Sequence, residues 1–181
     1  MKMADENSSL LLIIDIQEKL VAALEKDTVV LKAAKLTKAA NILNIPAIVS
    51  EQYPKGLGRT VSAISENLPI NYCKFEKTNF SLVKEEGFLD KLKSYGRNQI
   101  ILCGIETHIC VHQTAADLID AGFDVIVVKD ACASRNKYEF KQGIEAMQAN
   151  GAKISCLEIL LFEWLKSSKH PKFKEIQTLI K

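Results

Sequence analysis

The sequence lacks the features that mark several protein classes. It has only three histidines and five cysteines. The cysteines are scattered along the chain and odd in number, so they fit neither a zinc site nor a disulfide framework. No apolar run approaches the roughly 20 residues that a membrane-spanning helix requires. The apolar stretch 8–14 is too short for a signal peptide and runs straight into Asp15. We therefore expect a protein of the reducing cytoplasm, with no cofactor and no membrane partner.

An excess of one charge is also missing. The net charge of +2 over 181 residues is too small to indicate a nucleic-acid or membrane partner. Hydrophobic residues make up 48% of the chain, which is enough for a full core. Because no repeats, low-complexity tracts or linkers interrupt it, we expect a single domain over residues 1–181.

Apolar runs alternate with helical patterns along the whole chain. The expected strands are 10–14, 46–50, 71–75, 98–103, 124–128 and 152–156. The expected helices are 18–24, 28–43, 60–68, 87–95, 107–121, 138–149, 158–166 and 173–180. Nearly continuous apolar strands are typical of parallel sheets buried on both faces. The alternation predicts an α/β fold with one parallel sheet between two layers of helices.

Three chemically active side chains follow three of these strands. Asp15 follows the first strand, Lys77 the third and Cys110 the fourth, close to where a helix begins. Open α/β sheets bind ligands at the carboxyl ends of their strands, and a helix N-terminus lowers the pKa of a thiol. In a doubly wound sheet of order 3-2-1-4-5-6, Asp15 and Cys110 flank the switch point, and Lys77 has to reach across from an outer strand.

The same residues have plainer structural interpretations. Cys110 can be one more buried cysteine, since a free thiol packs as a small hydrophobe. Asp15 can cap the helix that follows it. As a group the three are chemically consistent, because a carboxylate can take the proton of a thiol and an ammonium group stabilises the thiolate. We expect Thr107 to be the N-cap of the helix that carries Cys110.

Residues in the strand-end loops are the candidates for substrate contact: Gln17, Glu51, Gln52, Phe80 and Thr107. Glu51 and Gln52 can equally be solvated, and Phe80 can simply pack. After the fifth strand, Asp130 and Arg135 are expected to form a local ion pair. The apolar segment 159–165, with Trp164, is either core or a contact between subunits.

Three stretches resemble the motifs of the isochorismatase-like cysteine hydrolase family. They read Leu-Ile-Ile-Asp-Ile-Gln at 12–17, Glu-Lys-Thr-Asn-Phe at 76–80 and Gly-Ile-Glu-Thr-His-Ile-Cys-Val at 104–111. The resemblance spans nearly the whole chain and implies a three-layer, Rossmann-like α/β/α sandwich that forms homo-oligomers. It also implies a catalytic triad of Asp15, Lys77 and Cys110. A cis peptide bond between Ile105 and Glu106 is implied too, with an oxyanion hole formed by the N–H groups of Glu106 and Cys110.

Two departures from family patterns narrow the expected chemistry. Nicotinamidases of this family bind a metal through histidines after the second strand, whereas His108, His112 and His170 all lie elsewhere. Isochorismatases proper hydrolyse a vinyl ether and lack the nucleophilic cysteine that Cys110 would supply. Segments 51–58 and 170–173 most resemble the small isochorismatase domain-containing proteins.

The sequence thus predicts a metal-independent cysteine hydrolase that cleaves the C–N bond of a small-molecule amide through a thioester. Asp15 would take the proton of Cys110 and later pass it to the leaving amine, and Lys77 would hold the pair ionised. Two alternatives remain, a vinyl ether hydrolase and a non-catalytic binding or redox-sensing module of the same fold.

Overall fold

The computed structural model describes residues 3–25 and 28–181 of the chain. Its centre is a six-stranded, all-parallel sheet in the order β3-β2-β1-β4-β5-β6, which confirms the predicted topology. The strands are β1 (Ser9–Ile14), β2 (Ala47–Gln52), β3 (Cys73–Lys77), β4 (Gln99–Ile105), β5 (Asp124–Ala133) and β6 (Lys153–Ser155).

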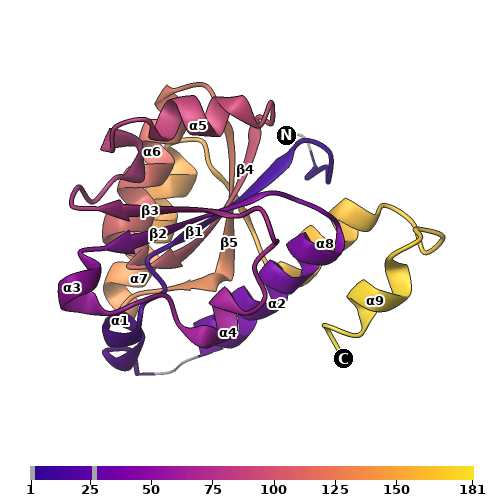
Figure 1. Cartoon of the computed structure of the whole chain (residues 1–181), viewed down its shortest axis with the longest axis horizontal. Helices are drawn as coiled ribbons and strands as arrows, with labels where there is room; N and C mark the ends of the chain where they lie inside the picture. The colour runs from indigo at the N-terminus through magenta and orange to yellow at the C-terminus, as the bar shows by residue number, and fades with distance from the viewer. Residues whose placement is uncertain (1–2, 26–27) are drawn as a thin grey trace.

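Helices cover both faces of this sheet, as predicted for a three-layer sandwich. α2 (Thr28–Ile42) and α8 (Leu157–Leu165) lie on one face, and α5 (Phe88–Ser94), α6 (His112–Asp120) and α7 (Lys137–Ala149) lie on the other (Figure 1). The shorter elements are α1 (Glu18–Ala22), α3 (Pro54–Leu57), α4 (Ser62–Ser65), η1 (Leu82–Lys84), η2 (Thr107–Val111) and α9 (Phe173–Gln177). No helix in the described ranges is long and apolar enough to cross a membrane.

The two central strands anchor the sheet. Every residue of β1 and β4 is buried, as expected for apolar strands covered on both faces. Complete burial of one Leu or Ile side chain contributes about 1.5–3 kcal/mol, so these strands are a large part of the core. Their register pairs Ile14 with Gly104, so the chain leaves both strands at the same edge of the sheet.

Gly104 is required where the central strands meet. A Cβ atom at this position would lie 2.1 Å from the carbonyl oxygen of Ile14, and the Gly104 φ of +145° also disfavours any side chain. Only glycine lets β4 pass β1 this closely, one residue before Asp15.

β5 differs most from its prediction, because it continues to Ala133 instead of ending near residue 128. A register shift between Leu102 and Gly104 of β4 lets the longer strand stay paired. The predicted Asp130–Arg135 ion pair is wrong, because an extended strand carries these residues apart at about 3.3 Å per residue. Asp130 instead lies 3.2 Å from Lys32 and accepts a hydrogen bond from the Leu157 N–H, and Arg135 contacts Glu106.

The segment 159–165 lies within α8 and belongs mostly to the core. Trp164 is fully buried, and its indole N–H donates to the Ser9 hydroxyl at 2.9 Å. Ile159 and Phe162 are exposed on the outer side of the helix, where the Phe162 ring lies 6.4 Å from the ring of Phe173.

Candidate active site

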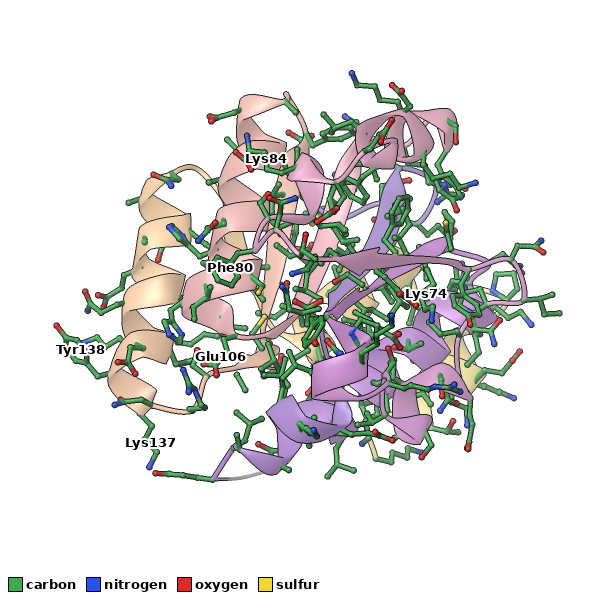
Figure 2. The ribbon with its side chains drawn as sticks, turned by 60° about the vertical axis from the view of Figure 1, so that its left-hand side comes forward. Lys74, Phe80, Lys84, Glu106, Lys137 and Tyr138 are labelled. Atoms are coloured by element: carbon green, nitrogen blue, oxygen red, sulfur yellow. The ribbon has the colours of Figure 1, made fainter. Side chains whose placement is uncertain are left out.

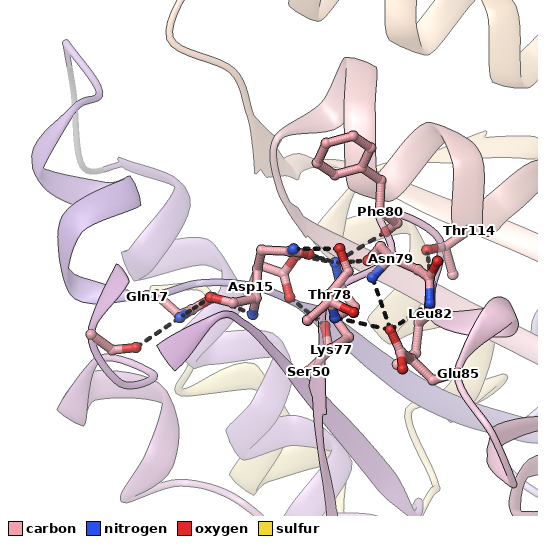
Figure 3. Close-up of polar contacts among 12 residues, drawn as sticks. Asp15, Gln17, Ser50, Lys77, Thr78, Asn79, Phe80, Leu82, Glu85 and Thr114 are labelled. Atoms are coloured by element: carbon pink, nitrogen blue, oxygen red, sulfur yellow. Dashed lines mark hydrogen bonds and ion pairs between the residues drawn. The ribbon is translucent and has the colours of Figure 1, made fainter. Parts of the chain in front are cut away.

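A buried ion pair lies at the carboxyl edge of the sheet. The Lys77 ammonium is 2.7 Å from Oδ2 of Asp15, and both side chains are fully buried. The Ser50 hydroxyl donates to the other carboxylate oxygen, Oδ1, at 2.6 Å. The ammonium also donates to three oxygens: Gln52 Oε1 at 2.5 Å, Phe80 O at 3.0 Å and Asn79 O at 3.2 Å (Figure 3). Buried charges need such partners to offset their desolvation.

Lys77 reaches Asp15 across an intervening strand. It ends β3 and pairs in register with Gln52 of β2, the strand that separates β3 from β1. The long side chain extends over the end of β2 to the carboxylate of Asp15. The structure thus brings together two of the three residues that the sequence placed on different strands.

Asp15 occupies an unusual backbone conformation. Its φ is 51°, and its carbonyl accepts the Gln17 N–H at 2.8 Å, so the chain turns sharply at the end of β1. A non-glycine residue in this region costs about 1–3 kcal/mol and persists where its surroundings hold it in place. Such strain collects at functional sites, and here it aims the carboxylate across the edge of the sheet.

Cys110 completes the cluster. It lies in η2, a turn of π-helix that follows β4, and it is 7% exposed. Its thiol lies close enough to the Asp15 carboxylate and the Lys77 ammonium for both charges to shift its pKa. Burial and the Asp15 charge raise the pKa of Cys110 to about 12, although Lys77 acts in the opposite direction. The resting residue is therefore a thiol.

The Asp15 carboxylate is suited to accept this proton. Burial raises the pKa of Asp15, and this effect outweighs the lowering by Lys77 and Ser50. Although Oδ2 lies 2.7 Å from the Lys77 ammonium, it accepts no well-oriented hydrogen bond from the described residues. An available lone pair on a basic oxygen beside a thiol is the arrangement that general-base catalysis needs.

The turn that carries Cys110 begins at Glu106. The peptide bond between Ile105 and Glu106 is cis. The Glu106 carbonyl accepts the N–H groups of Ile109 at 3.1 Å and Val111 at 3.2 Å, and within the described part of the chain the Glu106 N–H has no acceptor. The prediction that Thr107 caps this helix is wrong. The π-helical turn places Glu106 at the N-cap and Thr107 inside the first turn, where the Thr107 hydroxyl is buried without a partner among the described residues.

Two of the expected substrate contacts have structural partners instead. Gln17 is fully buried, and its amide N–H groups donate to the carbonyls of Gln52 and Gly58. Glu51 accepts from the N–H and hydroxyl of Thr60 and pairs with Lys74 at 3.1 Å. Both side chains thus hold the segment 53–60 against the end of β2. Among the expected contacts, Gln52 binds the ammonium of Lys77.

A cavity of about 440 Å³ lies between the loop after β3, which follows Lys77, and helix α6, and its lining does not include Asp15, Lys77 or Cys110 themselves. Its lining includes Phe80, Ser81, Lys84, His112, Ala116 and Asp117. Phe80 is 53% exposed, and its carbonyl contacts Lys77, which links the cavity to the ion pair. The Ser81 hydroxyl and Nδ1 of His112 are buried without partners among the described residues, so this wall has unused hydrogen-bonding capacity.

Sequence reasoning missed Ser50, Ser81, His112 and Arg135 as members of this region. Ser50 had a visible signal, because a hydroxyl ends an otherwise apolar strand beside the strand of Asp15. Ser81 and His112 become neighbours of one cavity only through the packing of the β3 loop on α6. Within residues 3–25 and 28–181, no group of three or more His, Cys, Asp or Glu side chains is placed to hold a metal ion.

Known proteins share both the sequence and the fold. The isochorismatase domain matches residues 9–159. Isochorismatase domain-containing protein 2 of Xenopus laevis is 39% identical over 97% of this chain and 84% of its own length. A secreted isochorismatase effector of Phytophthora sojae is 37% identical over 97% of this chain and 85% of its own length.

Among solved structures, one described as the MAR1 ribonuclease of Caenorhabditis elegans is 39% identical to this chain. It superimposes with a TM-score of 0.94, covering 99% of this chain and 92% of the other. These matches bear out the resemblance of the three motifs. The chain belongs to the isochorismatase family.

Proposed function

We propose that this isochorismatase-family hydrolase cleaves the C–N bond of a small-molecule amide through a thioester on Cys110. The observation that carries the proposal is the buried cluster in which a paired carboxylate and ammonium lie close enough to one thiol to shift its pKa. A nucleophile, a base and a compensating cation are the parts that covalent acyl transfer needs. Asp15, Lys77 and Cys110 are the proposed catalytic triad.

In the first step, Asp15 accepts the thiol proton as the sulfur attacks the amide carbonyl. Because the pKa of Cys110 is raised to about 12, proton transfer accompanies the attack instead of preceding it. The S–C bond forms, and the carbonyl electron pair moves onto oxygen. The N–H groups of Glu106 and Cys110 stabilise that oxyanion.

Collapse of this intermediate breaks the C–N bond. Asp15 passes its proton to the leaving nitrogen, so a neutral amine departs and a thioester remains on Cys110. Asp15 then takes a proton from water, which adds to the thioester. The second oxyanion collapses as the C–S bond breaks and the carboxylic acid leaves, and Asp15 returns its proton to the sulfur, which restores the Cys110 thiol. No step in this sequence requires a metal or a cofactor.

Lys77 compensates charge and orients the base. Its ammonium is held by Gln52 and two backbone carbonyls, so it remains beside Asp15 throughout the cycle. It favours the carboxylate before proton transfer and the transient thiolate during it. We assign Phe80 and Gln52 to the wall that the substrate meets. Gln17 and Glu51 act through the loop that they hold, and Thr107 through the turn that carries the nucleophile.

The proposal extends to three properties of the whole molecule. The chain acts as one domain and forms a homo-oligomer of two or more copies, which light scattering of the purified protein tests directly. It works in the cytoplasm, and fractionation of cells that express it tests this. The fractionation experiment is informative because the relative from Phytophthora sojae is described as secreted, so location differs from the one proposed here in at least one related protein.

The test uses p-nitrophenyl acetate as an activated acyl donor and a panel of primary amides, with ammonia release as the readout. We expect a burst of p-nitrophenolate equal to the enzyme concentration and an acetyl group on Cys110 in the peptide map. Cys110→Ala should abolish both, whereas the matched control Cys156→Ala should retain them. Full activity of Cys110→Ala with a vinyl ether would favour the ether hydrolase. Because the related Caenorhabditis elegans structure is described as a ribonuclease, RNA is tested as well, and its cleavage by Cys110→Ala would overturn the thioester mechanism. A wild-type protein that cleaves none of these substrates would favour a non-catalytic module.

A further inference from the structure

A second ion pair involves Glu106, the residue that begins the turn η2. Because η2 carries Cys110, we refer to residues 106–111 as the nucleophile turn. The carboxylate of Glu106 is buried, and Oε1 lies 2.6 Å from Nε of Arg135. Its other oxygen, Oε2, accepts the backbone N–H of Arg135 at 3.3 Å. Arg135 therefore holds both oxygens of one carboxylate, one through its side chain and one through its main chain.

The next residues of the turn are tied to the same segment. Nδ1 of His108 lies 3.0 Å from the Ser134 hydroxyl and 3.5 Å from Oε2 of Glu106. Ser134 and Arg135 connect β5 to α7. Figure 2 shows Glu106 on the side of the molecule where α7 begins with Lys137 and Tyr138. The turn that carries Cys110 is thus held to the β5–α7 connection by two pairs of contacts, Glu106 with Arg135 and His108 with Ser134.

These contacts leave the Glu106 peptide little freedom. Its carbonyl accepts two N–H groups of the turn, its side chain is held by Arg135, and its N–H has no acceptor among the described residues. The carbonyl and side-chain contacts fix the Cα and nitrogen of Glu106, and the preceding residue, Ile105, is held at the end of β4, so the direction of the N–H between them is also set. Stabilisation of an oxyanion depends on donors that are aimed before the charge develops.

We propose that Arg135 is a positioning residue, which aims the Glu106 N–H at the substrate carbonyl oxygen through its ion pair with the Glu106 carboxylate. This inference rests on the proposed function, since it assumes acyl transfer at Cys110. The Arg135 side chain is 61% exposed, whereas the Glu106 side chain is only 7% exposed. Loss of Arg135 therefore leaves a buried carboxylate without its cation and should lower stability as well as slow acylation, so the positioning role has to be measured on folded protein by a ratio of rates.

The test compares two electrophiles that are attacked by the same sulfur. Iodoacetamide forms a C–S bond as iodide leaves, without an oxyanion. p-Nitrophenyl acetate adds the sulfur to a carbonyl, so its reaction passes through an oxyanion before p-nitrophenolate leaves. The ratio of the two rate constants at Cys110 reports on the oxyanion hole alone, because both reactions share the thiol and its base.

For Arg135→Met we expect the acylation rate to fall by about 10-fold to 100-fold, less than the loss of a whole oxyanion donor. Alkylation by iodoacetamide should change by no more than about twofold, because the triad is intact. Arg135→Lys should recover part of the acylation rate, since a cation remains near Glu106. Lys137→Met is the matched control, because it removes a cation that is 87% exposed two residues away, and it should leave both rates unchanged.

A second variant keeps the test independent of Arg135 itself. Glu106→Gln keeps the shape of the side chain without its charge and should lower acylation selectively. Adding Arg135→Met to it should lower the rate no further, because both changes break one interaction. Equal loss of both reactions in Arg135→Met would indicate a structural role and overturn the inference. Unchanged acylation would also overturn it, including the case in which Arg135 binds an anionic group of the substrate. A wild-type protein that neither reagent modifies at Cys110 would refute the proposed function itself.

Discussion

Substitution of Gly143 by alanine tests how closely α7 packs against η2, the turn that carries Cys110. Gly143 is buried on α7, where a Cβ atom would lie 2.8 Å from Cα of His108, 3.0 Å from its nitrogen and 3.1 Å from the carbonyl carbon of Thr107. All three are backbone atoms of η2, so no flexible side chain can give way. Ordinary van der Waals contacts of a Cβ atom begin at 3.4 Å, and the shortest distance here is 2.8 Å. The helix α7 and the turn therefore have to separate by about 0.6 Å.

The expected effects on stability and activity differ. Alanine in a helix gains about 1 kcal/mol over glycine, while overpacking costs about 1–3 kcal/mol, so the net destabilisation is about 0–2 kcal/mol. A displacement of about 1 Å at reacting groups can cost about 100-fold in rate, so a smaller shift of η2 should lower acylation by about tenfold or more.

Thermal unfolding and the p-nitrophenyl acetate burst measure the two effects on one sample. Gln142→Ala is the matched control, because this exposed neighbour on α7 gains helix propensity without touching η2. A Gly143→Ala protein with higher stability and full acylation would refute the reasoning, since it would mean that the two backbones separate at no cost to the site.

Four further predictions follow from the charges in the site. Asp15→Asn should move the pH midpoint of Cys110 alkylation downward, because the Asp15 charge raises the thiol pKa, yet it should abolish amide turnover; turnover that persists would remove Asp15 as the base. Lys77→Met should move the same midpoint upward and slow alkylation, because Lys77 lowers that pKa, and an unchanged pH profile would contradict this. The folded protein should lose stability as pH rises above about 9, where unfolded cysteine releases a proton that the folded thiol of Cys110 keeps. Each such thiol contributes up to about 1.4 kcal/mol per pH unit, so urea unfolding between pH 8 and about 10.5 should give a shallower decline in Cys110→Ala. Treatment with a chelator should leave acylation unchanged, and activity that is lost and then restored by zinc would contradict the metal-independent mechanism.

Two of the residues at the carboxyl edge of the sheet were predictable from the sequence because each follows a recognisable strand. Asp15 interrupts an apolar strand, and Cys110 follows another strand after a glycine, so strand order alone brings them together. Lys77 has no such signal of its own, since most lysines are solvated; the resemblance to family motifs identified it. The order of the strands and the placement of Asp15, Lys77 and Cys110 at one edge of the sheet were therefore predictable from the sequence.

The details that escaped prediction depend on contacts between distant segments. Thr107 follows the preference for threonine at N-caps, but the turn of π-helix begins one residue earlier and moves it inside. Arg135 was paired with Asp130 because they are close in sequence, whereas the extra length of β5 carries Arg135 to Glu106. Gln17 and Glu51 remain candidates for substrate contact, but their hydrogen bonds to Gly58 and Thr60 could not be predicted, because a linear pattern does not show which loop folds against the end of a strand.

The close passage of β4 over β1 at Gly104 has a consequence for how this scaffold can diversify. It fixes, through backbone atoms, the spacing between the ends of β1 and β4, after which Asp15 and the turn of Cys110 follow. The segment 78–81 is tied to the site, because the carbonyls of Asn79 and Phe80 accept hydrogen bonds from Lys77. The segment 53–60 borders Lys77 without holding its ammonium, so exchange of this segment between relatives should change which molecules are accepted while Asp15, Lys77 and Cys110 keep their geometry. The segment 53–60 can thus vary in sequence, whereas the backbone contact between β1 and β4 at Gly104 has to be kept.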